Sequence, residues 1–463
     1  LIRTSDGAHL WSKQYDRKMV DVFKIQDEVA TEVVNAIQGV LPAADQQRML
    51  GQSTVNVAAY QEYLKGIALL PDRKVDNLQQ AVGHFERAIE IDPSYARAYA
   101  MASIALGLLA EYTADSPDLI SRRERYTERA LELSPGLGEA HIAQANRLRE
   151  IGDLAAAEKS YQRGIELAPS YSSGYQWYGE ILFYEIGNPV KGLSMFERAF
   201  ALDPLSPVVQ ATYGSALANL GRLDQAFAIT NKLLAEQPEL PIATRQLASL
   251  YSARGDLVLA LRTHNQTIQN EPTEPNRIDK CETLQKFGAI AEAERCASAL
   301  ALQYPKSDNQ RRLMALLKFN EGDFASALAQ VNSVGLAEAW TRADLLQLTG
   351  QSEQALSIYR ILVPELFKQP ANADSIFYPG DTVSVAAALI GVGADAQAKV
   401  LLRLGIKKAA ALPLVGSMGR RWSEVSAYAL LGEYDNACKA LAEAADKGYF
   451  NSYMNLSVDP ALT

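Results

Sequence analysis

Small, aromatic and polar residues follow one another in the same order many times along this chain, and a proline closes each round. In one clear example, Ala157, Tyr161 and Gly164 lie three or four residues apart, on one face of a predicted helix. Gly152 and Asp153 separate this helix from an earlier one, since glycine adopts the left-handed backbone geometry of a tight turn at little cost. The pattern predicts a unit of two α-helices joined by a short turn.

The closing prolines give the length of the unit. After a first interval of 42 residues they recur every 33 to 35 residues, at Pro93, Pro135, Pro169, Pro204, Pro238, Pro272 and Pro305. A proline cannot continue a helix, so each one marks the end of a second helix. A period near 34 residues is typical of helix–turn–helix units that stack and bury their apolar faces against their neighbours.

The same residue types return in register in other units. Two examples are Ala81, Phe85 and Ala88 in the first unit and Gly192, Phe196 and Ala199 in the fourth. This order of small residue, aromatic residue, small residue and proline resembles the tetratricopeptide repeat. We therefore expect an all-α superhelical solenoid of about eleven helix pairs, with a small α/β remnant (a β-hairpin plus a helix) at the N-terminal end.

The repeats divide the chain into segments. We expect a regular array over residues 51–305 and degenerate units at 306–365, where the closing proline is lost. A proline-containing interruption at 366–380 precedes further degenerate units at 381–447. Residues 448–463 are expected to cap the open end, because a terminal repeat must shield its apolar face from water.

Residues 1–50 do not follow the repeat. The sequence Ser5-Asp6-Gly7 is a turn signal between two predicted strands, and an amphipathic helix is expected from about Val22 to Gln38. The segment resembles the closing part of the TolB-like domain of bacterial signalling proteins. The residues that carry this resemblance are Gly7, Leu10, Trp11, Tyr15, Asp16, Phe23, Gln26, Asp27 and Glu28.

In that family the TolB-like domain lies between an N-terminal output module and a C-terminal tetratricopeptide array. The output module is either a CadC-like winged-helix DNA-binding domain or a class III adenylate or guanylate cyclase domain. The resemblance implies that this chain, which begins at Leu1 rather than at a methionine, is the sensory or scaffolding region of a larger regulator. A free-standing assembly scaffold is one alternative, and the C-terminal region of a cyclase is another.

Composition and charge exclude several other classes. Hydrophobic residues make up 48% of the chain and charged residues 21%, which is typical of a folded protein. The net charge of -9 argues against nucleic-acid binding, which requires a concentrated basic surface. We interpret the longest basic cluster, Arg122–Arg125, as a solvated helix face. No apolar run is long enough for a membrane span.

The sequence contains no recognisable catalytic or metal-binding arrangement. The histidines lie in different units without the short spacing of metal ligands, and we interpret them as surface or packing residues: His9, His84, His141 and His264. The glycine-rich stretch Gly391–Ala396 has no strand before it and is interpreted as a helix-pair turn. We therefore predict no enzyme activity, no metal and no cofactor within this chain.

The cysteines are few. Cys281, Cys296 and Cys438 do not form a disulfide framework or a CxxC motif. Cys281 and Cys296 fall within one predicted helix pair, where we expect packing rather than redox chemistry. A reducing compartment fits this usage, and we expect a cytoplasmic protein. The periplasmic face of the inner membrane is the alternative if the parent protein has an upstream membrane helix.

In the tetratricopeptide family the first helix of each pair lines a concave groove that binds a protein or peptide, and we expect such a partner here, with self-association as an alternative. Matched position by position, the resemblance implies a groove formed by Asn146, Arg149, Gln176, Trp177, Glu180, Tyr184, Thr212, Asn219, Arg245, Ser249, Ser252, Asp279, Glu282 and Lys286. The set is mixed in charge and lacks the dense basic clamp that binds acidic tails. Trp177 and Tyr184 are the best candidates for exposed aromatic contacts.

Overall fold

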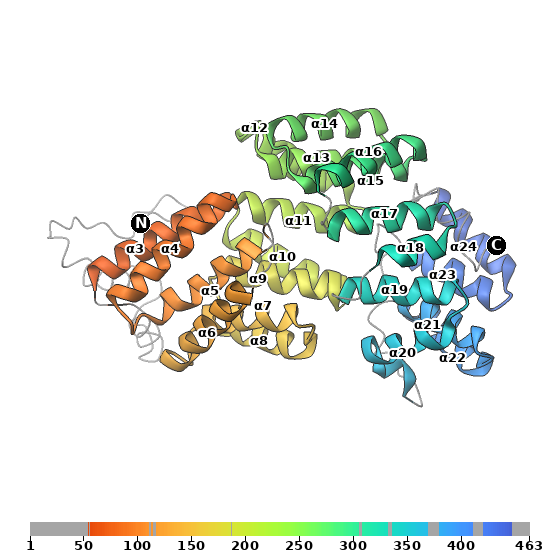
Figure 1. Cartoon of the computed structure of the whole chain (residues 1–463), viewed down its shortest axis with the longest axis horizontal. Coiled ribbons are helices and arrows are strands. Elements are labelled where there is room, and N and C mark those ends of the chain that lie inside the picture. Colours follow the sequence, from red (N-terminus) through yellow and green to blue (C-terminus); the bar gives the residue numbers. More distant parts are fainter. Residues whose placement is uncertain are drawn as a thin grey trace, which may run out of the picture. The chain divides into compact units, whose positions relative to one another are not determined.

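The computed structural model describes residues 54, 56–110, 113, 117–186, 188–304, 308–331, 336–368, 379–410 and 420–446. The hairpin and helix predicted for residues 1–50 and the cap predicted for residues 448–463 lie outside the described residues. In the described part, the chain forms eleven consecutive pairs of α-helices (Figure 1), which confirms the predicted all-α repeat architecture.

Each pair has a first and a second helix. The first helices are α3 (Val57–Leu69), α5 (Ala96–Ala110), α7 (Gly138–Glu150), α9 (Ser172–Glu180), α11 (Pro207–Asn219), α13 (Pro241–Arg254), α15 (Glu274–Lys286), α17 (Asp308–Asn320), α19 (Leu336–Leu348), α21 (Pro379–Gly391) and α23 (Arg420–Leu430). The second helices are α4 (Val75–Ile91), α6 (Pro117–Leu133), α8 (Leu154–Leu167), α10 (Pro189–Leu202), α12 (Leu223–Glu236), α14 (Leu257–Asn270), α16 (Ile290–Gln303), α18 (Phe324–Gln330), α20 (Ser352–Leu362), α22 (Asp395–Ala410) and α24 (Tyr434–Asp446). Short helices η2 (Leu70–Asp72), η3 (Ile181–Glu185) and η4 (Pro364–Phe367) complete the described elements.

The chain divides into two compact units, Leu1–Ile181 and Leu182–Thr463. The boundary falls in η3, a π-helical turn that directly follows α9. A π-helical turn interrupts the regular backbone hydrogen bonding of an α-helix. The two units are therefore described separately below.

The residues of the repeat signature form the core between helices. Tyr161 is fully buried, and its ring stacks on Tyr178 of the next helix pair with 5.7 Å between the ring centroids. Gly164 lies so close to Ile142 of α7 that an added Cβ would come within 2.4 Å of the Ile142 side chain. The small residue thus lets the two helices approach, and the aromatic residue fills the space beside them.

Glycines at the turns within pairs have left-handed backbones, as the pattern predicts. Gly152 has φ 80°, and Asp153 then caps α8 by accepting a hydrogen bond from the Ala156 backbone amide. The stretch Gly391–Ala396 connects α21 to α22, with Gly393 at φ 77°. Its interpretation as a helix-pair turn is confirmed.

The interruption predicted at residues 366–380 lies mostly outside the described residues, and its extent stays a prediction. Its first residues belong to η4 (Pro364–Phe367), whose Leu366 is buried in the core of the surrounding pairs, and α21 already begins at Pro379. Residues 369–378 lie outside the described part.

The basic cluster on α6 is not a solvated helix face. The Arg123 side chain is only 6% exposed and forms an ion pair with Glu150 of α7. The neighbouring Glu124 pairs with Arg147, also of α7, at 2.7 Å. The interpretation of Arg122–Arg125 as a solvated face is therefore wrong for Arg123, because the sequence does not reveal carboxylates contributed by the next repeat.

Cys281 of α15 and Cys296 of α16 form a disulfide bond. The turn between the two helices brings their Cα atoms to 5.6 Å, which is within bridging range. Cys281 is fully buried beside Ile278 and Leu284. The expectation that these cysteines only pack is wrong, although their placement within one helix pair is confirmed.

No helix in the described ranges combines the length and the apolar character that a membrane crossing requires.

Candidate partner-binding surface

The first helices of successive pairs in the second unit contact one another directly, from α11 through α13 and α15 to α17 (Figure 1). Residues one repeat apart in the sequence are therefore neighbours on one face. Asn219 donates a hydrogen bond of 3.2 Å to the Tyr184 hydroxyl, and Arg245 of α13 pairs with Asp279 of α15. We call this surface of α11, α13, α15 and α17 the first-helix face.

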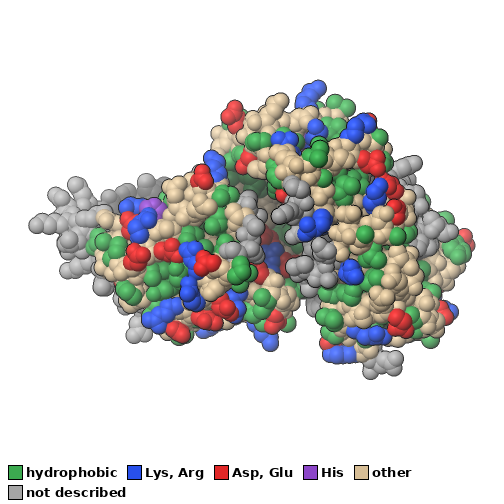
Figure 2. Space-filling model, in the orientation of Figure 1, with side chains coloured by type: hydrophobic (Ala, Val, Ile, Leu, Met, Phe, Trp, Pro, Cys, Tyr) green, Lys and Arg blue, Asp and Glu red, His purple; other side chains and the backbone are tan. Residues whose placement is uncertain are grey.

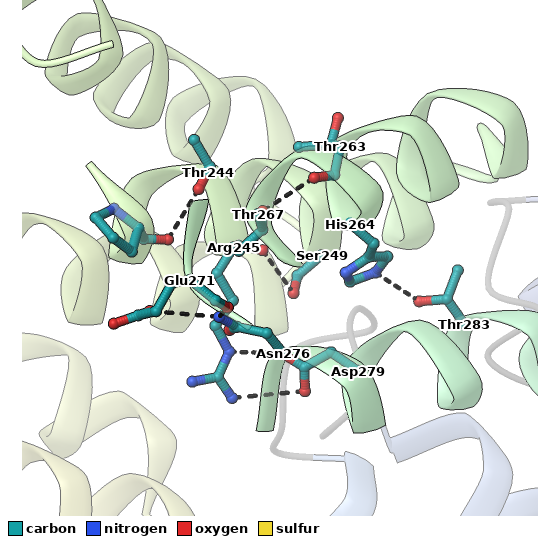
Figure 3. A network of polar contacts seen from close by, with 11 residues as sticks. Thr244, Arg245, Ser249, Thr263, His264, Thr267, Glu271, Asn276, Asp279 and Thr283 are labelled. Atoms are coloured by element: carbon teal, nitrogen blue, oxygen red, sulfur yellow. Dashed lines mark hydrogen bonds and ion pairs between the residues drawn. The ribbon is translucent and has the colours of Figure 1, made fainter. Parts of the chain in front are cut away.

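The Arg245–Asp279 pair joins α13 and α15, the two middle helices of this face (Figure 3). Arg245 Nε lies 2.5 Å from one carboxylate oxygen of Asp279, and Nη2 lies 3.5 Å from the other. Ser249, one turn further along α13, is exposed and donates a hydrogen bond to the Arg245 carbonyl. Exposed ion pairs contribute little to stability, so these side chains can exchange their partners at small cost.

Further charges extend the face along α15 and onto α17. Burial raises the pKa of Glu282, whereas the positive charges of Lys286 and Arg312 act against that rise. Arg312 was not predicted as a groove residue. The helix pair that contains it lacks the closing proline, by which groove positions are matched from repeat to repeat. Acidic and basic groups therefore alternate over three neighbouring helices.

His264 lies behind this face, between α14 and α15 (Figure 3). It is only 2% exposed, and its Nε2 atom is 2.9 Å from the Thr283 hydroxyl. Burial lowers the pKa of His264 to about 4, so the imidazole is neutral at physiological pH. Its interpretation as an interhelix packing residue is confirmed.

The exposure predicted for two aromatic side chains has opposite outcomes. Tyr184 is 44% exposed, as predicted, and its role in binding remains a prediction. Trp177 is only 5% exposed, so the prediction that it is an exposed contact is wrong. The Trp177 ring turns inward and packs edge-on against Tyr171, with 6.3 Å between the ring centroids.

Other predicted groove residues of the first unit engage neighbours within the protein. Gln176 is buried and donates a hydrogen bond of 3.1 Å to Glu180, so it is not a surface residue. Glu180 also pairs with Arg149 of the preceding first helix at 3.4 Å. Asn146 accepts a hydrogen bond from the Tyr161 hydroxyl. Arg149 and Glu180 are the charged members of this group, and their side chains are 31% and 22% exposed.

Two predicted hydroxyl residues on the second unit are less prominent than expected. Thr212 donates a hydrogen bond of 2.7 Å to the backbone carbonyl of Val208, within its own helix. Thr212 and Ser252 are both half-buried. The exposed predicted residues of the second unit are thus Tyr184, Arg245, Ser249 and Lys286.

The sequence did not point to a cluster of tyrosines in the first unit. This tyrosine cluster consists of Tyr60, Tyr63, Tyr95, Tyr171 and the ion pair of Arg97 with Glu139. Its members lie on α3, α5 and α7 and at the residues directly before α5 and α9, so no local motif reveals it. Burial raises the pKa of Tyr63, Tyr95 and Tyr171, and the negative charge of Glu139 adds to that effect in each case.

Figure 2 shows one face of the molecule, on which basic and acidic side chains are interspersed and neither sign forms a large patch. This distribution agrees with the near balance of 45 basic and 54 acidic residues. Among the residues that the structure describes, no three His, Cys, Asp or Glu side chains are grouped so that they could hold a metal ion.

No family model matches the chain. Among curated proteins, putative adenylate cyclase 3 of Rhizobium meliloti (strain 1021) is 29% identical over 160 residues, which is 34% of this chain and 27% of that protein. The human mitochondrial import receptor subunit TOM70 is 24% identical over 178 residues, which is 38% of this chain and 28% of that protein. The chain thus spans about a quarter of the length of these relatives.

Several solved structures are also similar to this chain, among them yeast Tom70 and Cut9. Yeast Tom70 has a TM-score of 0.39 and 16% identity, and the match covers 74% of this chain and 80% of that one. Cut9 in its APC/C heterotetramer with Hcn1 has a TM-score of 0.42 and 12% identity, and the match covers 96% and 95% of the two chains.

The helix pairs, their period near 34 residues and their buried small–aromatic–small signature give this chain a tetratricopeptide-type, all-α repeat fold. Of its two units, the second presents the first-helix face and the first contains the tyrosine cluster.

Proposed function

We propose that this chain is a non-catalytic protein-interaction module whose first-helix face binds an extended segment of a partner protein. The observation that carries this proposal is the series of polar side chains at one-repeat intervals, with Tyr184 beside Asn219 and Arg245 beside Asp279. An extended peptide presents amide donors and acceptors along its whole length, so a surface that holds it must offer matching groups at several successive positions.

The charges of the face define the kind of segment that fits. Arg245, Lys286 and Arg312 can pair with acidic side chains, while Asp279 and Glu282 can pair with basic ones. A partner segment of mixed charge therefore fits better than a uniformly acidic tail. The exposed Arg245–Asp279 pair stabilises the fold only slightly, so replacing it by contacts with a partner costs little.

A randomised hexapeptide library with acetylated and amidated ends would test this proposal on the immobilised full chain. In the Ser249→Arg variant, a long side chain projects from the exposed centre of the face, and we expect it to reduce the retained peptide about tenfold or more. Gln266→Arg is the matched control, since Gln266 is exposed on α14, the second helix of the same pair.

Equal retention by wild type and Ser249→Arg, with far-UV circular dichroism spectra that agree, would contradict binding at this face. Equal loss in both arginine variants would point to a general charge effect instead. Specific loss in Ser249→Arg alone would support the proposal.

We further propose that the module is the sensory or scaffolding part of a bacterial signalling regulator. The support is the TolB-like resemblance of residues 1–50 and the similarity to part of a putative adenylate cyclase. A free-standing scaffold and the C-terminal region of a cyclase remain the alternatives. An in-frame coding sequence for a winged-helix domain, for a cyclase domain or for neither, upstream of Leu1, would distinguish the three.

The disulfide bears on the compartment. Stable disulfides form in oxidising compartments such as the bacterial periplasm and are rare in the cytosol. We therefore favour the periplasmic alternative over the cytoplasmic one, on the strength of the Cys281–Cys296 bond. The exposed free Cys438 is a built-in probe, since a maleimide that cannot cross the inner membrane labels it only in the periplasm. Labelling only after cell lysis would favour the cytoplasm.

A further inference from the structure

The tyrosine cluster combines aromatic rings from repeats that are distant in the sequence. The rings of Tyr60 and Tyr63 on α3 stack with 6.2 Å between their centroids, and Tyr95 lies 5.3 Å from Tyr63. The negative charge of Glu139 also helps to raise the pKa of Tyr171, which belongs to the same cluster. Tyr60, Tyr63 and Tyr171 remain partly accessible to solvent, which distinguishes them from rings that only fill the core.

An ion pair lies among these rings. Arg97 Nε is 3.2 Å from Oε1 of Glu139, which comes from the next first helix along the chain. The other carboxylate oxygen, Oε2, is buried and has no hydrogen-bond partner among the described residues. The Glu139 side chain as a whole is 14% exposed. An unsatisfied carboxylate oxygen in such surroundings is costly, and a donor that reaches it recovers that cost.

We propose that the tyrosine cluster binds a lysine or arginine side chain of a partner peptide, whose cationic group donates to Glu139 Oε2 while its stem lies against the tyrosine rings. This inference rests on the proposed peptide-binding function and adds to it a second site, on the first unit, with its own specificity. Aromatic faces attract cations through their quadrupole, and a charge-assisted hydrogen bond to a carboxylate is stronger than a neutral one. Long basic side chains also bury their methylene stems readily against apolar surface.

Other ligand chemistries fit these residues less well. An anionic group would meet the Glu139 carboxylate, and the positive charge of Arg97 is already opposed by Oε1. An apolar side chain would cover the rings but leave Oε2 without a donor. Since burial raises the pKa of Tyr63 and of Tyr171, their hydroxyls stay protonated and introduce no competing negative charge.

The randomised hexapeptide library described above tests this inference with the full chain, because its blocked ends leave lysine and arginine as its permanently cationic groups. We expect peptides retained by the Ser249→Arg variant, in which the first-helix face is blocked, to be enriched in lysine and arginine at one position. In that background, the shape-matched Glu139→Gln change removes the charge and should reduce the enrichment about tenfold. Glu128→Gln is the control, since Glu128 is an exposed carboxylate of the same unit, on α6.

A second variant keeps the test decisive if Glu139→Gln perturbs folding, which far-UV circular dichroism would reveal. Tyr60→Leu removes a half-buried ring while keeping apolar contact, and we expect the enrichment to fall several-fold. Enrichment that is absent in the Ser249→Arg background, or that survives both Glu139→Gln and Tyr60→Leu, would overturn the inference while leaving peptide binding by the first-helix face intact. Retention of no peptide at all would overturn this inference together with the proposed function.

Discussion

The bond between Cys281 and Cys296 makes a quantitative prediction about the local stability of α15 and α16. It closes a loop of 15 residues, and loop-closure entropy assigns a stabilisation of about 3 kcal/mol to a cross-link of that length. Cys296 is half-buried, so the Cys296→Ser change removes the bond without placing a hydroxyl deep in the core. We expect the free energy of opening this helix pair to fall by about 3 kcal/mol.

Hydrogen exchange measured by mass spectrometry is the appropriate assay, because stacked repeats open locally rather than as one unit. A change of about 3 kcal/mol corresponds to an exchange rate roughly 100-fold faster for the protected amides of α15 and α16. Treatment of the wild type with a thiol reductant should give the same result. Cys438→Ser is the control, because Cys438 is exposed and has no disulfide partner.

Two results would contradict this reasoning. Exchange in α15 and α16 of Cys296→Ser within about threefold of the wild type would show that the cross-link does not limit their opening. An equal loss of protection in α21 and α22, which lie several repeats away, would show that the effect is not local loop closure.

Three further predictions concern packing and pH. Gly138→Ala should lower the free energy of unfolding in urea by about 1–3 kcal/mol, because an added Cβ would lie 2.7 Å from a backbone oxygen of α8. Gly136→Ala is the control, since a Cβ at Gly136 meets open space and should change the stability little. Similar effects of both changes would contradict the packing argument. Burial raises the pKa of Asp381 to about 7, and the charge of Asp344 adds to the effect, so the stability that protonated Asp381 contributes is lost as pH rises through 7. Asp381→Asn should therefore melt at a higher temperature than the wild type at pH 8.5 but not at pH 3.5. Equal melting temperatures of the two proteins at both pH values would refute the assignment. Burial lowers the pKa of His264 to about 4 from its ordinary 6.5, so the wild type should lose about 3 kcal/mol of unfolding free energy as pH falls from 6.5 to 4. In thermal unfolding, the stability of His264→Gln should fall less steeply with decreasing pH. An unchanged pH dependence would contradict this prediction.

The helix pairs were predictable because their signals are local. Tyr161 and Gly164 meet α7 of their own pair across a turn of fixed length, so spacing alone places them in the core. The turn glycines follow from backbone geometry that few other residues adopt. The number of pairs could be predicted for the same reason, even where the closing proline is lost.

The surface was harder to predict because it depends on the neighbouring repeat. The position of Trp177 on a first helix does not reveal that its ring packs against Tyr171. Arg123 looks solvated until Glu150 from the next first helix is placed beside it. Tyr60 and Tyr171 belong to repeats that are far apart in sequence, so no local pattern shows that they belong to one cluster.

The structure of α15 explains why an array can be predicted while its ligand cannot. Asp279 and Cys281 are two residues apart, so they point to nearly opposite sides of the helix. Cys281 is fully buried and bonded to α16, whereas Asp279 meets Arg245 on the first-helix face. The inner side is constrained by packing and carries the repeating signature. The outer side is free of that constraint, and its residues can vary with the partner without cost to the fold.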